Sequence, residues 1–149
     1  MERLLFDSSI YITAFRNDDP ALRAGPLAQD SSIWLSSVVL EELYAGANRR
    51  DRYIVERLER DFDRARRILV PNLRDWSKIG KLLAALAAQY HYEQIARGRL
   101  TNDALIVSSA ARAGITVITS NARDFARLAE FRPFAWRVVN PWNKRPESA

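Results

Sequence analysis

Residues 115–119 read Ile-Thr-Val-Ile-Thr, the clearest strand signal in the chain. All five side chains branch at Cβ, which favours an extended backbone packed on a sheet. A helix capped by Thr101 or Asn102 is expected to reach Ala113 and end at Gly114, and a short helix over about 122–128 follows the strand. A short strand between two helices is typical of an α/β domain with a mainly parallel sheet.

Other short apolar runs bounded by turn residues predict further strands, at residues 4–6, 33–35, 68–70 and 137–139. Helices are expected between them, starting from Ser8 or Ser9, from Pro20, and from Ser36 or Ser37 as far as Gly46. Two longer helices are predicted over residues 50–67 and 73–95, and Gly98 is expected to break the helical pattern.

The composition fits one intracellular domain. A length of 149 residues with 48% hydrophobic side chains allows a single buried core, which we expect over 1–140, with a polar tail at 141–149. Cysteine is absent from the sequence, which excludes disulfides, thiolate zinc sites and cysteine nucleophiles. The N-terminus does not resemble a signal peptide, and the longest apolar run, 82–88, is too short to span a bilayer. We therefore expect a cytoplasmic protein without a membrane partner.

The formal net charge of +5 and pI of about 10.0 favour a polyanionic partner. Many small basic proteins bind no nucleic acid, so charge alone leaves the matter open. Arg49, Arg50 and Arg52 are candidates for gripping an RNA backbone, and the start of a solvated helix explains them equally well.

Acidic residues gather where ligands bind in parallel α/β sheets, beyond the carboxyl ends of the strands. Asp7 ends the first strand, Asp124 follows residues 115–119, and Asp103 begins the helix before them. Glu41 and Glu42 lie in the helix after residues 33–35, and periodicity does not choose between them. Clustered carboxylates repel unless a cation neutralises them, and hard oxygen ligands suit Mg²⁺ or Mn²⁺. Such a site on a basic protein favours phosphodiester hydrolysis.

Each acid also has a structural explanation. Asp7 can cap the helix that follows it, and Asp103 and Asp124 suit the first turn of a helix because the helix dipole favours acids there. The functional hypothesis therefore depends on the set rather than on any single residue.

Other hydrolytic chemistries lack their residues. His91 is the only histidine, which excludes a two-histidine ribonuclease mechanism, and we interpret it as structural. The sequence contains neither a Gly-x-Ser-x-Gly turn nor a glycine-rich phosphate loop.

Four segments, in order, resemble the PIN-domain nucleases of the VapC-like toxin type. They are Leu-Phe-Asp-Ser-Ser at 5–9, Leu-Ser-Ser-Val-Val-Leu-Glu-Glu-Leu-Tyr-Ala-Gly at 35–46, Asn-Asp-Ala-Leu-Ile-Val at 102–107 and Val-Ile-Thr-Ser-Asn-Ala-Arg-Asp-Phe at 117–125. The second match selects Glu42 over Glu41. Many PIN domains carry an acid where this chain has Asn121, whereas the toxin-like branch often carries Asn.

The resemblance implies a three-layer α/β/α fold and an endoribonuclease that leaves a 5′-phosphate and a 3′-hydroxyl. It implies a Mg²⁺ or Mn²⁺ site formed by Asp7, Glu42, Asp103 and Asp124. Ser8, Thr119 and Asn121 would support these carboxylates. A homodimer silenced by a cognate antitoxin protein is also implied.

Two other functions fit parts of the pattern. An inactive PIN-like module would bind RNA or protein without cutting, although all four acidic positions are filled here. A receiver-type phospho-acceptor domain needs a second acid near the first strand and a lysine late in the chain. Asp7 has no acidic neighbour, and no lysine follows residues 115–119 before Lys144, which disfavours this alternative.

Overall fold

The structure is a computed structural model that describes residues 2–30, 32–90, 94–131 and 133–139. The tail expected at 141–149, and the interpretation of His91 as structural, fall outside these residues. No helix within the described ranges is both long enough and apolar enough to cross a membrane.

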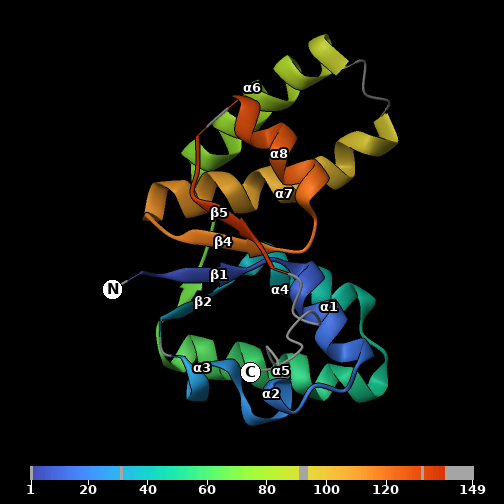
Figure 1. Ribbon diagram of the computed structural model, residues 1–149, viewed down its shortest axis with the longest axis vertical. Helices are drawn as coiled ribbons and strands as arrows, with labels where there is room; N and C mark the ends of the chain where they lie inside the picture. The colour runs from blue at the N-terminus through green and yellow to red at the C-terminus, as the bar shows by residue number, and fades with distance from the viewer. Residues whose placement is uncertain (1, 31, 91–93, 132, 140–149) are drawn as a thin grey trace, which may run out of the picture.

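A parallel sheet lies at the centre of the described chain (Figure 1). Its five strands, in the spatial order β3-β2-β1-β4-β5, are β1 (Leu4–Phe6), β2 (Ile33–Ser36), β3 (Ile68–Leu69), β4 (Thr116–Thr119) and β5 (Trp136–Val138). All neighbouring pairs are parallel, so the carboxyl ends of β1, β2 and β4 lie at one edge. The expected strands are confirmed, and none of their ends is shifted by more than one residue.

Helices cover both faces of this sheet. They are α1 (Ser8–Arg16), α2 (Pro20–Ala24), α3 (Pro26–Gln29), α4 (Ser37–Gly46), α5 (Arg49–Arg64), α6 (Leu73–Tyr90), α7 (Gln94–Ala113) and α8 (Ala122–Phe131). In Figure 1, α6, α7 and α8 lie on one side of the sheet, and α1, α2, α3 and α5 lie on the other. Helix α4 contacts both α1 and α7. The three-layer α/β/α fold is confirmed.

The core explains why the strands read as apolar runs. Leu5, Leu35 and Val117 are fully buried on neighbouring strands, because helices cover both faces of the sheet. All four residues of β4 are buried, so the segment with the clearest strand signal is also one of the most enclosed. This rigid centre positions the side chains that emerge at the carboxyl ends of the strands.

The expected break at Gly98 is wrong. Helix α7 runs without interruption from Gln94 to Ala113, through Thr101 and Asn102, so neither residue is an N-cap. A glycine inside a helix costs only about 1 kcal/mol relative to alanine. The long buried stretch from Ala104 to Ala110 in the same helix outweighs that cost. The predicted end is confirmed, because Gly114 takes the left-handed conformation, with φ of 67°, just beyond the helix.

The first helix begins at Ser8, one residue earlier than a Ser8 cap predicts and two earlier than a Ser9 cap predicts. Asp7, not Ser8 or Ser9, is the N-cap of α1, and its side chain accepts a hydrogen bond from the Ser9 backbone N–H. The other expected starts are confirmed, since Pro20 opens α2 and Ser36 caps α4.

Candidate active site

Asp7 lies at the junction between β1 and α1, with only 3% of its surface exposed. Its backbone N–H donates to the Ile118 carbonyl at 2.9 Å, which continues the pairing between β1 and β4. Its carboxylate therefore emerges at the carboxyl edge of the sheet, as the sequence predicts. The structural explanation also holds in part, because the same side chain caps α1.

Two hydroxyl groups fix the Asp7 carboxylate in place. Thr119 Oγ1, at the end of β4, donates to Asp7 Oδ2 at 2.8 Å, and the Ser9 hydroxyl donates to Asp7 Oδ1. Ser9 Oγ in turn accepts from the backbone N–H of Ser120 at 3.1 Å. Asp7, which directly follows β1, is thus held against the end of the neighbouring strand β4.

Asp124 is connected to Asp7 through a short chain of polar groups. The Asn121 backbone N–H donates to Thr119 Oγ1 at 2.9 Å, and Asn121 Nδ2 donates to Asp124 Oδ2 at 3.1 Å. Asp124 lies in the first turn of α8, half-buried. Asn121 therefore links Asp124 to Thr119, the residue that donates to Asp7.

Glu42 differs sharply from its neighbour Glu41. Glu42 is half-buried on α4, and its Oε1 atom is fully enclosed with no hydrogen-bond partner among the described residues. Glu41 is exposed. An enclosed carboxylate oxygen without a donor is costly unless a cation or water satisfies it. Glu42, unlike Glu41, therefore has a carboxylate oxygen that a cation or a water could satisfy.

Burial disfavours the charged forms of Asp7 and Glu42. Burial raises the pKa of Asp7, and the hydrogen bonds from Ser9 and Thr119 oppose that rise. Burial, and then the charge of Glu41, raise the pKa of Glu42, while a hydrogen bond from Ser8 lowers it and the charge of Asp7 raises it further. The effect of Asp7 on Glu42 places the two carboxylates within electrostatic reach of one another.

Asp103 lies in the interior of α7 rather than at its start, because α7 begins at Gln94. The explanation of Asp103 as a first-turn acid is therefore wrong. The residue is half-buried, on a helix that contacts both α4 and β4. These contacts bring the helix of Asp103 against the helix of Glu42.

A metal ion needs several donor atoms close together and of a suitable chemical type. Among the described residues, no three acidic or histidine side chains gather closely enough to hold a metal ion between them. The structure instead links Asp7 electrostatically to Glu42 and, through Thr119 and Asn121, to Asp124. All-oxygen donors and the unpartnered Glu42 oxygen fit Mg²⁺ or Mn²⁺ in chemical type.

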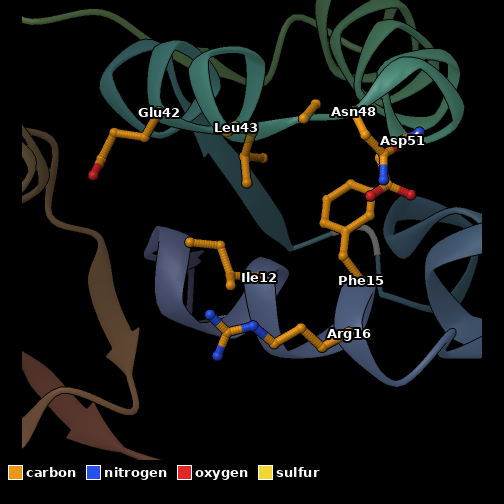
Figure 2. Close-up of a pocket in the computed structure, with 9 residues that line it drawn as sticks. Ile12, Phe15, Arg16, Glu42, Leu43, Asn48 and Asp51 are labelled. Carbon is orange, nitrogen blue, oxygen red and sulfur yellow. Dashed lines mark hydrogen bonds between the residues drawn. The ribbon is translucent and has the colours of Figure 1, made fainter.

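Glu42 also lies at one end of a pocket of about 520 Å³ (Figure 2). Figure 2 shows Ile12, Phe15 and Arg16 of α1 facing α4 across the pocket, with Asn48 and Asp51 at the end far from Glu42. Arg49, Arg50 and Arg52 follow in the first turn of α5, and all three are exposed. The predicted basic residues thus continue from the far end of the pocket.

Sequence reasoning missed Ser9. Resemblance singled out Ser8, but Ser9 is the serine whose hydroxyl donates to Asp7. Its spacing from Asp7, two residues into a capped helix, was the available signal, since a helix N-cap accepts from that turn.

Comparison of the sequence with known families gives a match to the PIN domain over residues 4–131. The chain belongs to the PIN domain family. Comparison with curated proteins gives no match. This PIN domain therefore has to be placed among its relatives by structure.

Three similar solved structures contain VapBC complexes. A chain of the DNA-bound VapBC from Salmonella typhimurium has a TM-score of 0.65 at 20% identity, covering 93% of this PIN domain and 98% of that chain. VapBC2 from Rickettsia felis, bound to a promoter DNA fragment, gives 0.64 at 19% identity, covering 92% and 98%. VapBC-1 from nontypeable Haemophilus influenzae gives 0.59 at 21% identity, covering 91% and 96%. At these identities the likeness shows a common fold.

Proposed function

We propose that this PIN domain is a Mg²⁺- or Mn²⁺-dependent endoribonuclease that acts in the cytoplasm as the toxin of a toxin-antitoxin pair. The observation that carries the proposal is the enclosed, unpartnered Glu42 oxygen within electrostatic reach of the buried Asp7. Such an arrangement costs stability without a cation, and it lies where ligands bind in parallel α/β sheets.

Asp7, Glu42, Asp103 and Asp124 would hold the metal. A bound Mg²⁺ or Mn²⁺ would supply water activation and charge neutralisation at the phosphodiester. Thr119 and Ser9 keep both oxygens of Asp7 oriented, and Asn121 orients Asp124. Ser8, which follows Asp7 directly, would support the Glu42 carboxyl group, whose pKa it lowers. Cleavage of this kind leaves a 5′-phosphate and a 3′-hydroxyl.

The proposed partners follow from the same assignment. A net charge of +5 favours RNA as the substrate, with the arginines of the first α5 turn on its backbone. The solved VapBC structures that share this fold support a cognate antitoxin protein as the inhibitor. We further propose that the toxin is a homodimer.

The test is cleavage of end-labelled RNA by wild type, Asp7→Asn and Asp103→Asn, each with Mn²⁺ and with EDTA. We expect cleavage only by wild type with Mn²⁺, because both variants lose a ligand charge. Asp63→Asn, at an exposed position of α5, is the matched control and should cut as wild type does. Equal cleavage by Asp7→Asn, with its fold intact by circular dichroism, contradicts the proposal.

One observation favours a second function, that of a binding module without cleavage. As the described side chains stand, no three acids gather around a common point. Calorimetry with Mn²⁺ in the presence of RNA separates the two functions. Metal binding that is lost in Asp7→Asn supports the nuclease, whereas RNA binding with no metal affinity supports the binding module.

A further inference from the structure

A second hollow lies beside the first turns of α5, away from the carboxylates. Its volume is about 650 Å³, and its lining residues are Arg49, Arg50, Arg52, Tyr53 and Glu56. We call it the α5 hollow. The side chain of Tyr53 is 75% exposed, which is unusual for a large aromatic residue, and it does not pack in the core. Three cations and one exposed aromatic ring therefore share one concave surface.

The arginines retain positive charge available to a ligand. Arg50 forms only a long, exposed ion pair with Asp18, at 3.9 Å. Arg49 and Arg52 form no ion pair within the described ranges. Exposed pairs of this kind are weak, so even Arg50 is not firmly held. Glu56 offsets one of the three charges, and the hollow remains net positive.

The α5 hollow begins one residue beyond the pocket that contains Glu42, at the N-terminus of α5. That pocket ends at Asn48 and Asp51 (Figure 2), and Arg49 follows Asn48 directly. Along α1, the path from Asp7 to Arg16 spans nine residues, or about 14 Å at 1.5 Å per residue. A flexible polyanion whose reactive bond lay at the carboxylates could thus extend along the pocket, past Arg16, toward the N-terminus of α5 where the α5 hollow lies.

We propose that the α5 hollow binds an unpaired nucleotide of the RNA substrate, with its base stacked on Tyr53 and the flanking phosphates on Arg49 and Arg52. The choice of RNA as the ligand rests on the proposed ribonuclease function. Stacking on an exposed ring requires a free base face, which a duplex does not offer. An aromatic ring among arginines is the combination that binds single strands without needing a particular base.

The binding test is fluorescence anisotropy in EDTA, so that no variant cuts. The probes are a labelled 12-nucleotide adenine–uridine RNA without self-complementarity and the duplex formed with its complement. We expect Tyr53→Ala to weaken binding of the single strand by roughly 5- to 100-fold, the range that loss of one stacked base represents. Tyr53→Phe should restore binding of the single strand, and the duplex should bind Tyr53→Ala and wild type equally.

A matched control is available on the other side of the sheet. Trp76, on α6, is also an exposed aromatic residue, with 53% of its surface accessible. Trp76→Ala should leave binding of the single strand unchanged. The proposal is overturned if Tyr53→Ala binds the single strand as wild type does, or if Trp76→Ala weakens binding equally.

Salt dependence tests the arginines separately. Each phosphate contact on a single strand contributes about 0.7 to the slope of log affinity against log salt. Arg49→Ala and Arg52→Ala should each reduce the slope by about that amount, while Arg64→Ala, at the exposed far end of α5, should not. Unchanged slopes for Arg49→Ala and Arg52→Ala overturn their placement on phosphates.

The failure of this subsite and the failure of the nuclease give different results. If Tyr53→Ala binds normally while wild type cuts RNA with Mn²⁺, the subsite is wrong and the nuclease stands. If binding of the single strand depends on Tyr53 while wild type never cuts RNA, the subsite is supported and the protein is an RNA-binding module rather than a nuclease.

Discussion

The hydroxyl group of Thr119 donates a 2.8 Å hydrogen bond to the carboxylate of Asp7 across 112 residues of sequence. The same hydroxyl oxygen accepts the Asn121 backbone N–H. One side chain at the end of β4 thus orients the acid that follows β1 and accepts a hydrogen bond from the turn that carries Asn121. The proposed site depends on this hydroxyl although it would not touch the substrate.

We expect Thr119→Val to weaken Mn²⁺ binding by roughly 10- to 100-fold, as loss of a group that orients a metal ligand does. Valine has a similar shape but no hydroxyl, so Asp7 loses a donor and the Asn121 N–H loses its acceptor. The fold should lose only about 1–2 kcal/mol. Calorimetry with Mn²⁺ and thermal unfolding measure the two effects. Thr119→Ser should recover most of the affinity, and a serine variant as weak as the valine variant would contradict this role.

Asp7→Asn should not destabilise the metal-free protein at neutral pH. Asparagine is an equally good helix N-cap, and it removes a buried charge whose pKa burial raises. We expect the variant in EDTA to melt at or above the wild-type temperature, by roughly 2–4 °C for each kcal/mol relieved. Mn²⁺ should then raise the melting temperature of wild type only.

This advantage of Asp7→Asn should depend on pH. A raised pKa in the folded state means that folded Asp7 holds its proton more tightly than unfolded Asp7 does. The contribution of Asp7 to wild-type stability is therefore most favourable in acid and declines as pH rises from the ordinary Asp pKa through the raised value. The difference between variant and wild type should shrink when thermal scans in EDTA are repeated at acidic pH. A difference that grows in acid would refute this explanation.

Glu42 and Glu41 offer a matched pair of substitutions one residue apart. Glu42→Gln removes charge from the half-buried carboxyl group that has the orphaned oxygen, whereas Glu41→Gln changes an exposed one. We expect Glu42→Gln to lower Mn²⁺ affinity at least roughly 10-fold. Glu41→Gln should have little effect, because solvent and salt screen an exposed charge. If calorimetry gives equal losses for both variants, Glu42 has no special role.

Gly98 and Gly114 should respond in opposite directions to alanine. Gly98 lies inside the continuous helix α7, where alanine is favoured by roughly 0.5–1 kcal/mol. Gly114 has φ of 67°, and a Cβ there would lie 3.2 Å from an Arg3 guanidinium nitrogen. Gly114→Ala should therefore cost roughly 1–2 kcal/mol. Urea unfolding of the two variants checks both signs, and a destabilised Gly98→Ala would argue against an unbroken α7.

Sequence reasoning succeeded where the controlling physics is local. The apolar run at Leu4–Phe6 and the β-branched run at Thr116–Thr119 are strands in the structure, so an acid directly after the first strand lies at the carboxyl edge of the sheet. The sequence also placed Asp7 at the end of the first strand and Asp124 just past residues 115–119, and the structure makes these two strands neighbours. These assignments needed only strand ends and the rules of parallel sheets.

Reasoning from sequence failed where distant groups decide. Asp7, Ser8 and Ser9 are all good helix caps, and the choice depends on where β1 leaves the sheet. Its last residue, Phe6, pairs with Ile118, so Asp7 is the first residue free to cap. The partner of the Ser9 hydroxyl, the Ser120 N–H, lies 111 residues away and leaves no local pattern. The continuity of α7 through Gly98 likewise depends on packing farther along that helix.

The dual position of Asp7, as helix cap and as buried acid, has an evolutionary consequence. One base change converts an aspartate codon into an asparagine codon, and asparagine can cap α1 just as well. If the proposed function holds, a lineage can therefore lose cleavage in one step without losing the fold or the surfaces that meet its partners. On that proposal, gene copies that sequester an inhibitor but leave RNA intact would lie one mutation away from this PIN domain.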